Sequence, residues 1–241
     1  FYGKLPVSIG NLKSLIELNI ISCYFSGLVP TSLGNLTNLI ILSLSSNKFS
    51  GQIPFSLANL TQLSQLKLYT NSFSAQTLFW LGKQTKLTIL RLAETNLYGD
   101  IPSSLKNLTQ LTDFSVGGNQ ITGQIPPWLG NLTQLTLLEL GTNKFHGSIP
   151  QSICSLANLE YLSLAENNLS GRVDMDSFLK LKNLTSLQLS GIDLSFLSNS
   201  TFNASTSKLQ LLGLNSCNLT EFPTFLRSQH ELKVLLLSRK D

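Results

Sequence analysis

A repeat of 24 residues runs through most of the chain and sets narrow limits on the fold it can adopt. Leucine recurs at this spacing, and a second column with the same spacing holds mainly asparagine. Because two independent columns share one period, we expect repeating units that stack on one another rather than a single globular core. The leucine column consists of Leu15, Leu39, Leu63, Leu87, Leu111, Leu135 and Leu159.

Each unit is predicted to contain one short strand followed by a return segment. In residues 37–60, TNLIILSLSSNKFSGQIPFSLANL, the side chains of Leu39, Leu42 and Leu44 point inward, because side chains alternate along a strand. The chain turns at position eleven, where a buried polar side chain can bond backbone groups that the turn leaves unpaired. A glycine, an Ile-Pro or Val-Pro pair and a short apolar helical turn complete the unit. The turn column at position eleven consists of Cys23, Asn47, Asn71, Thr95, Asn119, Asn143, Asn167 and Cys217.

The return segments resemble a known class of repeats. FSGQIP, LYGDIP, ITGQIP and FHGSIP follow the turn and are similar to the plant-specific class of leucine-rich repeats. The GNLT junctions at residues 34–37 and 130–133, together with SCNLTEFPTFLRSQ at residues 216–229, resemble the ectodomains of plant receptor-like proteins. The resemblance implies a leucine-rich-repeat solenoid of the α/β class. Such a fold is a curved right-handed superhelix with a parallel β-sheet on its concave face and short 3-10 or helical turns on its convex side.

We expect residues 1–241 to form a single leucine-rich-repeat domain of about ten plant-type repeats, uncapped at both ends. Solenoids need polar caps over their terminal cores, so we expect the natural protein to continue in both directions. Two units depart from the pattern. Residues 61–84 carry SAQTLFWLGK in place of the glycine and the Ile-Pro pair, and residues 182–206 carry Ile192 at position eleven. We interpret both as tolerated irregularities, with a functional loop as the alternative.

Nine Asn-x-Ser/Thr sequons predict a glycosylated, extracellular surface. Four of them share one repeat position, so their glycans would lie in a row on one flank and leave the sheet face open. The predicted glycosylation sites are Asn35, Asn59, Asn107, Asn131, Asn168, Asn183, Asn199, Asn203 and Asn218.

The sequence gives no sign of catalysis, of a cofactor or of a nucleic-acid partner. The net charge is +4, and the 17 Lys and Arg residues are scattered, which argues against nucleic acid and favours at most a weak preference for acidic polymers. Cys23 and Cys217 lie too many coils apart for a disulfide, and we expect both, like Cys154, to be buried thiols. His146 and His230 lie on different coils, so neither a catalytic triad nor a metal site is predicted.

The outward strand positions should carry binding specificity, because equal positions on successive coils are neighbours. We expect a basic and aromatic patch beside an acidic one, and mixed charge with tyrosine suits a peptide or protein partner. The alternative is that these charges pair with one another on a solvated face and contribute little. The candidate ligand-binding residues are Lys67, Tyr69, Arg91 and Glu94, followed by Asp113, Glu139, Tyr161 and Glu166.

The resemblance implies an immune-type receptor-like protein that binds a microbial or endogenous peptide or protein outside the cell. It also implies a location at the plasma membrane, facing the apoplast, and a receptor kinase as co-receptor. No apolar run is long enough to cross a bilayer, so membrane attachment would depend on segments absent from this chain. Two alternatives stay open. One is a secreted inhibitor of microbial cell-wall-degrading enzymes, similar to polygalacturonase-inhibiting proteins, and the other is the ectodomain of a growth-regulating receptor kinase.

Overall fold

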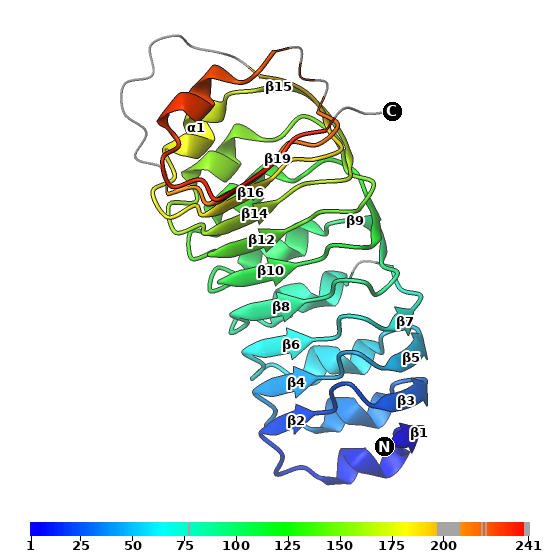
Figure 1. Cartoon of the computed structure of the whole chain (residues 1–241). Coiled ribbons are helices and arrows are strands. Elements are labelled where there is room, and N and C mark those ends of the chain that lie inside the picture. The colour runs from blue at the N-terminus through cyan, green and yellow to red at the C-terminus, as the bar shows by residue number, and fades with distance from the viewer. Residues whose placement is uncertain (77, 197–207, 218, 220, 239–241) are drawn as a thin grey trace. The chain divides into compact units, whose positions relative to one another are not determined.

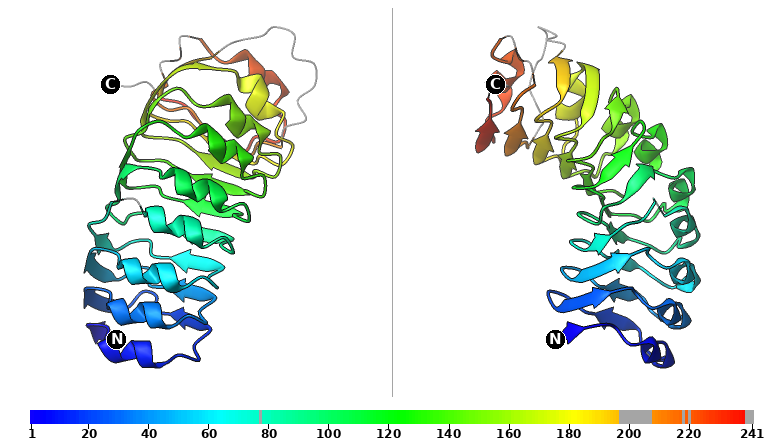
Figure 2. Two further views of the ribbon diagram at one scale, coloured as in Figure 1. Left: turned by 180° about the vertical axis from the view of Figure 1, so that it is seen from behind. Right: turned by 90° about the vertical axis from the view of Figure 1, so that its right-hand side faces the viewer.

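The computed structural model describes residues 1–76, 78–196, 208–217, 219 and 221–238. Its coils form two compact units, Phe1–Ile121 and Thr122–Asp241. Within each unit, the strands line one side of the stack and short helical turns line the other (Figure 1 and Figure 2). Each coil therefore contains the predicted strand and return segment, and in most coils the return segment includes a second short strand that the repeat did not predict.

One strand of each coil joins a parallel sheet, and the residue at its centre points into the core. Leu42 pairs with Leu66, and Leu66 lies level with Leu90 across the next strand. All three are fully buried, which supplies the apolar area that a single coil lacks. The first unit contains β2 (Glu17–Asn19), β4 (Ile41–Ser43), β6 (Gln65–Lys67), β8 (Ile89–Arg91) and β10 (Asp113–Ser115). The second unit contains β12 (Leu137–Glu139), β14 (Tyr161–Ser163), β16 (Ser186–Gln188), β18 (Leu211–Gly213) and β19 (Val234–Leu236).

A second strand follows the turn in most coils and pairs with its equivalent in the next coil. In the first unit these strands are β1 (Tyr2–Gly3), β3 (Tyr24–Gly27), β5 (Lys48–Gly51) and β7 (Ser72–Phe73), which form one parallel sheet, and β9 (Tyr98–Asp100). Strand β11 (Gln120–Thr122) pairs with β9. In the second unit they are β13 (His146–Gly147), β15 (Asn168–Val173) and β17 (Asp193–Phe196).

The return segment of each coil closes with a short helical turn that usually starts directly after a proline. Pro54, for example, adopts φ −68° and ψ 132° and accepts a hydrogen bond from Leu57 N at 3.1 Å. Proline suits this position because its fixed φ ends the extended segment and its missing N–H is not needed there. The turns of the first unit are η1 (Val7–Asn11), η2 (Thr31–Asn35), η3 (Phe55–Asn59), η4 (Phe79–Lys83) and η5 (Ser103–Asn107). Those of the second unit are η6 (Pro127–Asn131), η7 (Gln151–Ser155), α1 (Met175–Leu179) and η8 (Thr224–Ser228).

Asparagine at position eleven bonds the backbone of two coils. The Asn71 side chain donates to Leu44 O and to Leu68 O, both at 2.9 Å, and accepts from Phe49 N at 3.0 Å. Unpaired backbone groups at this buried turn would be costly, so one amide side chain stabilises three of them. Behind the turn, the Phe49 and Phe73 rings stack with centroids 6.5 Å apart.

Threonine and cysteine replace asparagine with fewer bonds. Thr95 Oγ1 donates to Leu92 O at 2.6 Å, while its backbone N–H is bonded by Asn119 Oδ1 of the next coil at 3.0 Å. Cys217 is buried and its thiol donates to Leu189 O at 3.0 Å. The prediction that all three thiols are buried is wrong for Cys23 and Cys154, which are only partly covered. Cys154 is the fourth residue of η7, at the repeat position that holds glycine or alanine in most other coils.

A glycine and a serine join the helical turns of neighbouring coils. A Cβ atom added to Gly34 would lie 2.3 Å from Ser56 O, so only glycine fits. Ser56 Oγ in turn donates to Thr31 O of the previous coil at 2.7 Å. The same pairing, which we call the Gly–Ser contact, occurs for Gly10 with Ser32, Gly34 with Ser56, Gly82 with Ser104, and Gly130 with Ser152.

The residue just before the turn column adopts a left-handed backbone conformation in coil after coil. Besides glycine, serine, threonine and glutamate occupy it with φ between 52° and 55°. A positive φ is uncommon for such residues, and the repeat imposes it wherever the strand ends. The residues are Ser22, Ser46, Thr70, Glu94, Gly118, Thr142, Glu166, Gly191 and Ser216.

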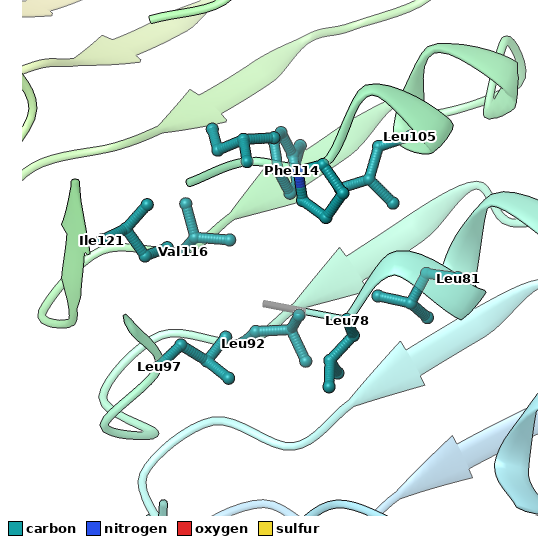
Figure 3. A pocket seen from close by; sticks show the side chains of 10 residues that line it. Leu78, Leu81, Leu92, Leu97, Leu105, Phe114, Val116 and Ile121 are labelled. Atoms are coloured by element: carbon teal, nitrogen blue, oxygen red, sulfur yellow. The ribbon is translucent and has the colours of Figure 1, made fainter. Parts of the chain in front are cut away.

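The irregular coil 61–84 keeps its place in the first unit by burying large side chains. Leu78 stands at the usual proline position, and both it and Trp80 are buried. A small apolar cavity remains beside Leu78, lined also by Leu92, Phe114 and Ile121 (Figure 3). The departure from the repeat is thus accommodated by large apolar side chains that pack in the core. The other irregular coil, 182–206, lies partly outside the described residues.

The second unit contains one coil with an α-helical turn. Coil 157–181 is one residue longer than the period and closes with α1. Asp174 caps this turn, because its carboxylate accepts from Asp176 N at 3.1 Å and from Ser177 Oγ at 2.7 Å. The extra residue is thus taken up by a change of helix type.

Candidate ligand-binding surface

The outward side chains of β6, β8 and β10 place opposite charges next to one another in the first unit. Lys67 lies level with Arg91 in the sheet register, and Asp113 follows on the next strand. Arg91 donates from both Nε, at 2.9 Å, and a terminal guanidinium nitrogen to Asp113 Oδ2. The predicted basic and acidic patches therefore meet here in an ion pair, which was the alternative interpretation of these charges.

Asp113 is much less accessible than its outward position predicts. Its side chain is 11% exposed, whereas that of Arg91 is 41% exposed, so the guanidinium group covers the carboxylate. The second carboxylate oxygen, Oδ1, is buried without a hydrogen-bond partner. A ligand on this face would contact Arg91 before Asp113, and Asp113 would act chiefly by holding Arg91 in place.

Lys67 and Tyr69 lie on the same coil beside this ion pair. Lys67 Nζ donates to Gln65 Oε1 at 2.7 Å within strand β6. Because glutamine is neutral, this hydrogen bond does not neutralise the positive charge of Lys67. The Tyr69 side chain is partly buried. The two residues therefore form the cationic and aromatic part of the face that the sequence predicts.

Glu94 lies at the edge of the same face, where the strand of its coil ends. Its backbone is left-handed with φ 53°, and its carboxylate accepts from Thr70 Oγ1 at 3.1 Å. A Cβ atom on Gly118 would lie 2.9 Å from Glu94 Cγ, so the glycine leaves room for this side chain. Thr70, Glu94 and Gly118 occupy equivalent positions of three successive coils and fix where the Glu94 charge is presented.

The second unit holds the three remaining candidates on or beside β12 and β14. Burial, and then the negative charge of Glu139, raise the pKa of Tyr161, while a hydrogen bond with Ser163 opposes the shift. The Tyr161 hydroxyl accepts from Gln188 Nε2 at 3.2 Å. Tyr161 thus remains a neutral hydroxyl at physiological pH beside a carboxylate.

Glu166 repeats the arrangement seen at Glu94. Its φ is 54°, and a Cβ atom on Gly191 would lie 2.7 Å from its carboxylate carbon. Burial chiefly raises the pKa of Cys217, and the Glu166 charge adds to that effect. Of the residues predicted to form an acidic patch, Asp113 belongs to the first unit, and Glu139, Tyr161 and Glu166 belong to the second.

Six of the predicted glycosylation sites have exposed side chains: Asn35, Asn59, Asn107, Asn131, Asn168 and Asn183. The first three end η2, η3 and η5, on the side of the first unit opposite the strand face (Figure 2). Asn199, Asn203 and Asn218 lie outside the described residues. Glycans at Asn35, Asn59 and Asn107 would leave the strand face of the first unit uncovered. Asn168, in contrast, begins strand β15 of the second unit.

Two buried glutamines break the leucine column that ends the helical turns. Gln84 is fully buried, donates from Nε2 to Leu57 O at 2.8 Å and has an unpaired Oε1. Gln229 is also buried with an unpaired Oε1. The sequence contained the signal for both, because glutamine stands where Leu36, Leu60 and Leu108 stand in other coils.

The described residues contain no cluster of three or more His, Cys, Asp or Glu side chains that could hold a metal ion. Nor does the described part of the chain contain a helix long and apolar enough to cross a membrane.

Comparison with known proteins agrees with this architecture. A family model described as Leucine Rich Repeat matches residues 14–36, 38–60 and 110–132. The Arabidopsis receptor kinase HAESA, solved with the peptide hormone IDA and the co-receptor SERK1, superposes with a TM-score of 0.81. It is 36% identical over 89% of this chain and 36% of that chain. The chain is a leucine-rich-repeat solenoid related to plant receptor ectodomains.

Two further relatives support this relationship. The ectodomain of the Arabidopsis thaliana receptor kinase GASSHO1/SCHENGEN3, solved with CASPARIAN STRIP INTEGRITY FACTOR 2, has a TM-score of 0.89 and 32% identity. The similarity covers 98% of this solenoid and 28% of that chain. Receptor-like protein 6 of Arabidopsis thaliana is 44% identical over 70 residues, which are 29% of this solenoid and 7% of that protein. The leucine-rich-repeat chain thus spans only part of the relatives it matches.

Proposed function

We propose that this solenoid is the ligand-recognition part of a plant cell-surface receptor and that its strand face binds a peptide or protein outside the cell. The observation that carries the proposal is the open strand face of the first unit, where Lys67, Tyr69 and Arg91 present cationic and aromatic groups. The related ectodomains of HAESA and GASSHO1/SCHENGEN3 were solved with a peptide hormone and with CASPARIAN STRIP INTEGRITY FACTOR 2. By analogy, we propose binding without catalysis, and a receptor kinase as co-receptor.

An immune role is the more specific form of this proposal. It rests on the resemblance of the GNLT junctions and of residues 216–229 to receptor-like proteins. The hormone complexes of the relatives favour an endogenous peptide as the second candidate. Under either form, the chain faces the apoplast and carries glycans on the flank away from the ligand.

A peptide display library selected on the whole chain tests the proposal. We expect selected peptides to bind the unchanged protein and to lose about a hundredfold in affinity to Lys67→Glu, because reversing a charge at an interface adds repulsion to the lost contact. Lys83→Glu, on the helical side of the same unit, is the matched control and should bind as the unchanged protein does. If all selected peptides bound Lys67→Glu as tightly as the unchanged protein, binding on the strand face would be contradicted.

Arg91 needs a different substitution. Arg91→Glu would leave the buried Asp113 carboxylate beside a second negative charge and would harm folding as well as binding. Arg91→Gln combined with Asp113→Asn replaces the ion pair by two amides of similar shape. We expect that double variant to fold and to bind selected peptides less tightly.

A further inference from the structure

The helical side of the first unit carries an exposed aromatic pair that the repeat does not require. Phe55 and Phe79 start η3 and η4, and the two residues are 58% and 65% exposed. The two ring centroids lie 6.1 Å apart, with the planes inclined by 33°. Other coils of this unit place valine, threonine or serine at this position, so the aromatic pair is particular to these two coils. Exposed aromatic groups of this size often mark binding sites.

Three lysines lie in or near η4 and η5. Lys83 ends η4, Lys106 lies in the last turn of η5, and Lys86 follows η4 after a short link; all three are exposed. In η4 only the first and last residues, Phe79 and Lys83, are exposed, so they share the outer face of that turn. In η5, Ser103, Lys106 and Asn107 are exposed. Gly82 packs so closely on η5 that an added Cβ would lie 2.5 Å from Ser104 O, so the faces of η4 and η5 are continuous.

The helical turns of the first unit contain no acidic residue of their own. None of the turns η1 to η5, all of which are described, contains an aspartate or glutamate. The acidic residues of the unit lie on or beside the strand face or on β9. Of these, Asp100 ends β9 three residues before η5 begins, whereas Glu17, Glu94 and Asp113 lie on or beside the strand face.

Lys83 also interrupts the row of predicted glycans. The sequons at Asn59 and Asn107 end η3 and η5, and Lys83 occupies the equivalent position of η4. A gap of one coil therefore remains open between two predicted glycans. The gap contains Phe79 and Lys83, whereas Lys106 lies in η5 next to the sequon at Asn107.

We propose that the outer face of η3, η4 and η5 binds an acidic polysaccharide. The flat C–H faces of sugar rings would pack on the electron-rich faces of Phe55 and Phe79. Carboxylates repeated along the sugar chain would pair with Lys83 and Lys106 on successive coils. An acidic protein is the less suitable partner, because two exposed rings on a convex surface offer no pocket for its side chains. This site lies opposite the strand face and does not depend on the proposed peptide binding.

The test is titration of the whole chain with an oligomer of galacturonic acid, followed by calorimetry. We expect measurable binding that weakens with added salt, because exposed charge pairs are screened. Lys83→Gln with Lys106→Gln should weaken binding about fivefold. The matched control, Lys48→Gln with Lys67→Gln, removes the same charge from elsewhere in the unit and should have little effect.

The aromatic contribution has its own controls. Phe79→Ser should weaken binding about fivefold, whereas Phe222→Ser, at an equally exposed phenylalanine of the second unit, should not. The methyl ester of the same oligomer, which lacks the charge, should bind far more weakly. The proposal is overturned if polyglutamate binds as tightly as the sugar oligomer and Phe79→Ser changes the affinity for neither polymer. It is equally overturned if the lysine pair and its control behave alike.

Discussion

Coils 37–60 and 61–84 are consecutive in the first unit. Each contains an equivalent strand, β4 or β6, but their return segments differ. Both bury a leucine at the strand centre, and their phenylalanines, Phe49 and Phe73, stack on each other. The first coil starts its helical turn after Pro54, whereas the second starts it after Leu78 and buries Trp80. The strand and the turn column therefore determine the stack, and the return segment can change once they are in place.

The largest effect should come from breaking the turn column, which both coils share with their neighbours. Asn119→Leu removes the side chain that accepts from Thr95 N and Leu97 N and donates to Leu92 O and Val116 O. Because these groups are buried, we expect a loss of about 3 kcal/mol in the free energy of unfolding, measured by urea denaturation. Asn38→Leu, which loses one exposed bond to Lys13 O, is the control and should cost under about 1 kcal/mol. Equal stability of the two variants would contradict the role of the turn column.

A smaller effect should come from the contact between helical turns. Gly34→Ala places a Cβ against Ser56 O, and we expect a loss of about 2 kcal/mol because backbone must move. Ala58→Gly is the matched change at the equivalent position of the next coil. There the residue 22 positions later is Trp80 instead of the serine of the Gly–Ser contact. Ala58→Gly should cost about 1 kcal/mol or less, from backbone entropy and lost packing. If the alanine at residue 34 were tolerated as well, the Gly–Ser contact would not set the spacing of the coils.

Restoring the regular residue to the irregular coil should have the opposite sign. Gln84→Leu removes a buried oxygen that lacks a partner, and Leu57 O keeps its bond from Leu60 N. We expect about 1 kcal/mol of added stability, seen as a higher urea midpoint at unchanged slope. The reciprocal change, Leu60→Gln, should destabilise the protein. Loss of stability in Gln84→Leu would mean that the glutamine supports the irregular return segment.

The smallest effect on stability at neutral pH is expected from a change at Cys154, in the helical turn η7 of the second unit. Burial, followed by the charge of Asp174, raises the pKa of Cys154 from 9.0 to about 12. Between these values the unfolded thiol loses its proton while the folded thiol keeps it, so stability falls as pH rises from about 9 towards 12. In Cys154→Ala, the free energy of unfolding should fall less between about pH 9 and pH 12 than in the unchanged protein. Below about pH 8, the two proteins should show nearly the same dependence on pH. Parallel profiles would argue against the raised pKa.

The fold could be predicted because leucine and asparagine recur at one spacing and each plays the same role in the coils that contain it. The Gly–Ser contact was visible in the sequence as Gly34 followed 22 residues later by Ser56, but its meaning required the distance between the turns. The left-handed position was not predictable, since Ser46, Thr70 and Glu94 share no chemical feature that signals it.

The candidate site was predictable only as a set of outward positions. The register made Arg91 and Asp113 neighbours, but whether they form a patch or a pair depends on side-chain conformation. The structure favours the pair, because Asp113 is nearly covered while Arg91 is not. Which of these residues touch a ligand remains a prediction.

The Gly–Ser contact has a consequence for how such a scaffold can diversify. Each serine bonds the main-chain carbonyl of the first residue of the preceding turn, as Ser104 bonds Phe79 O. Any amino acid supplies that carbonyl, so attachment between coils imposes no demand on the side chain, which projects into solvent. Natural selection can therefore change this outer row as freely as the strand face. A stack of such coils offers two separately variable surfaces, and a single chain could acquire a second specificity without losing the first.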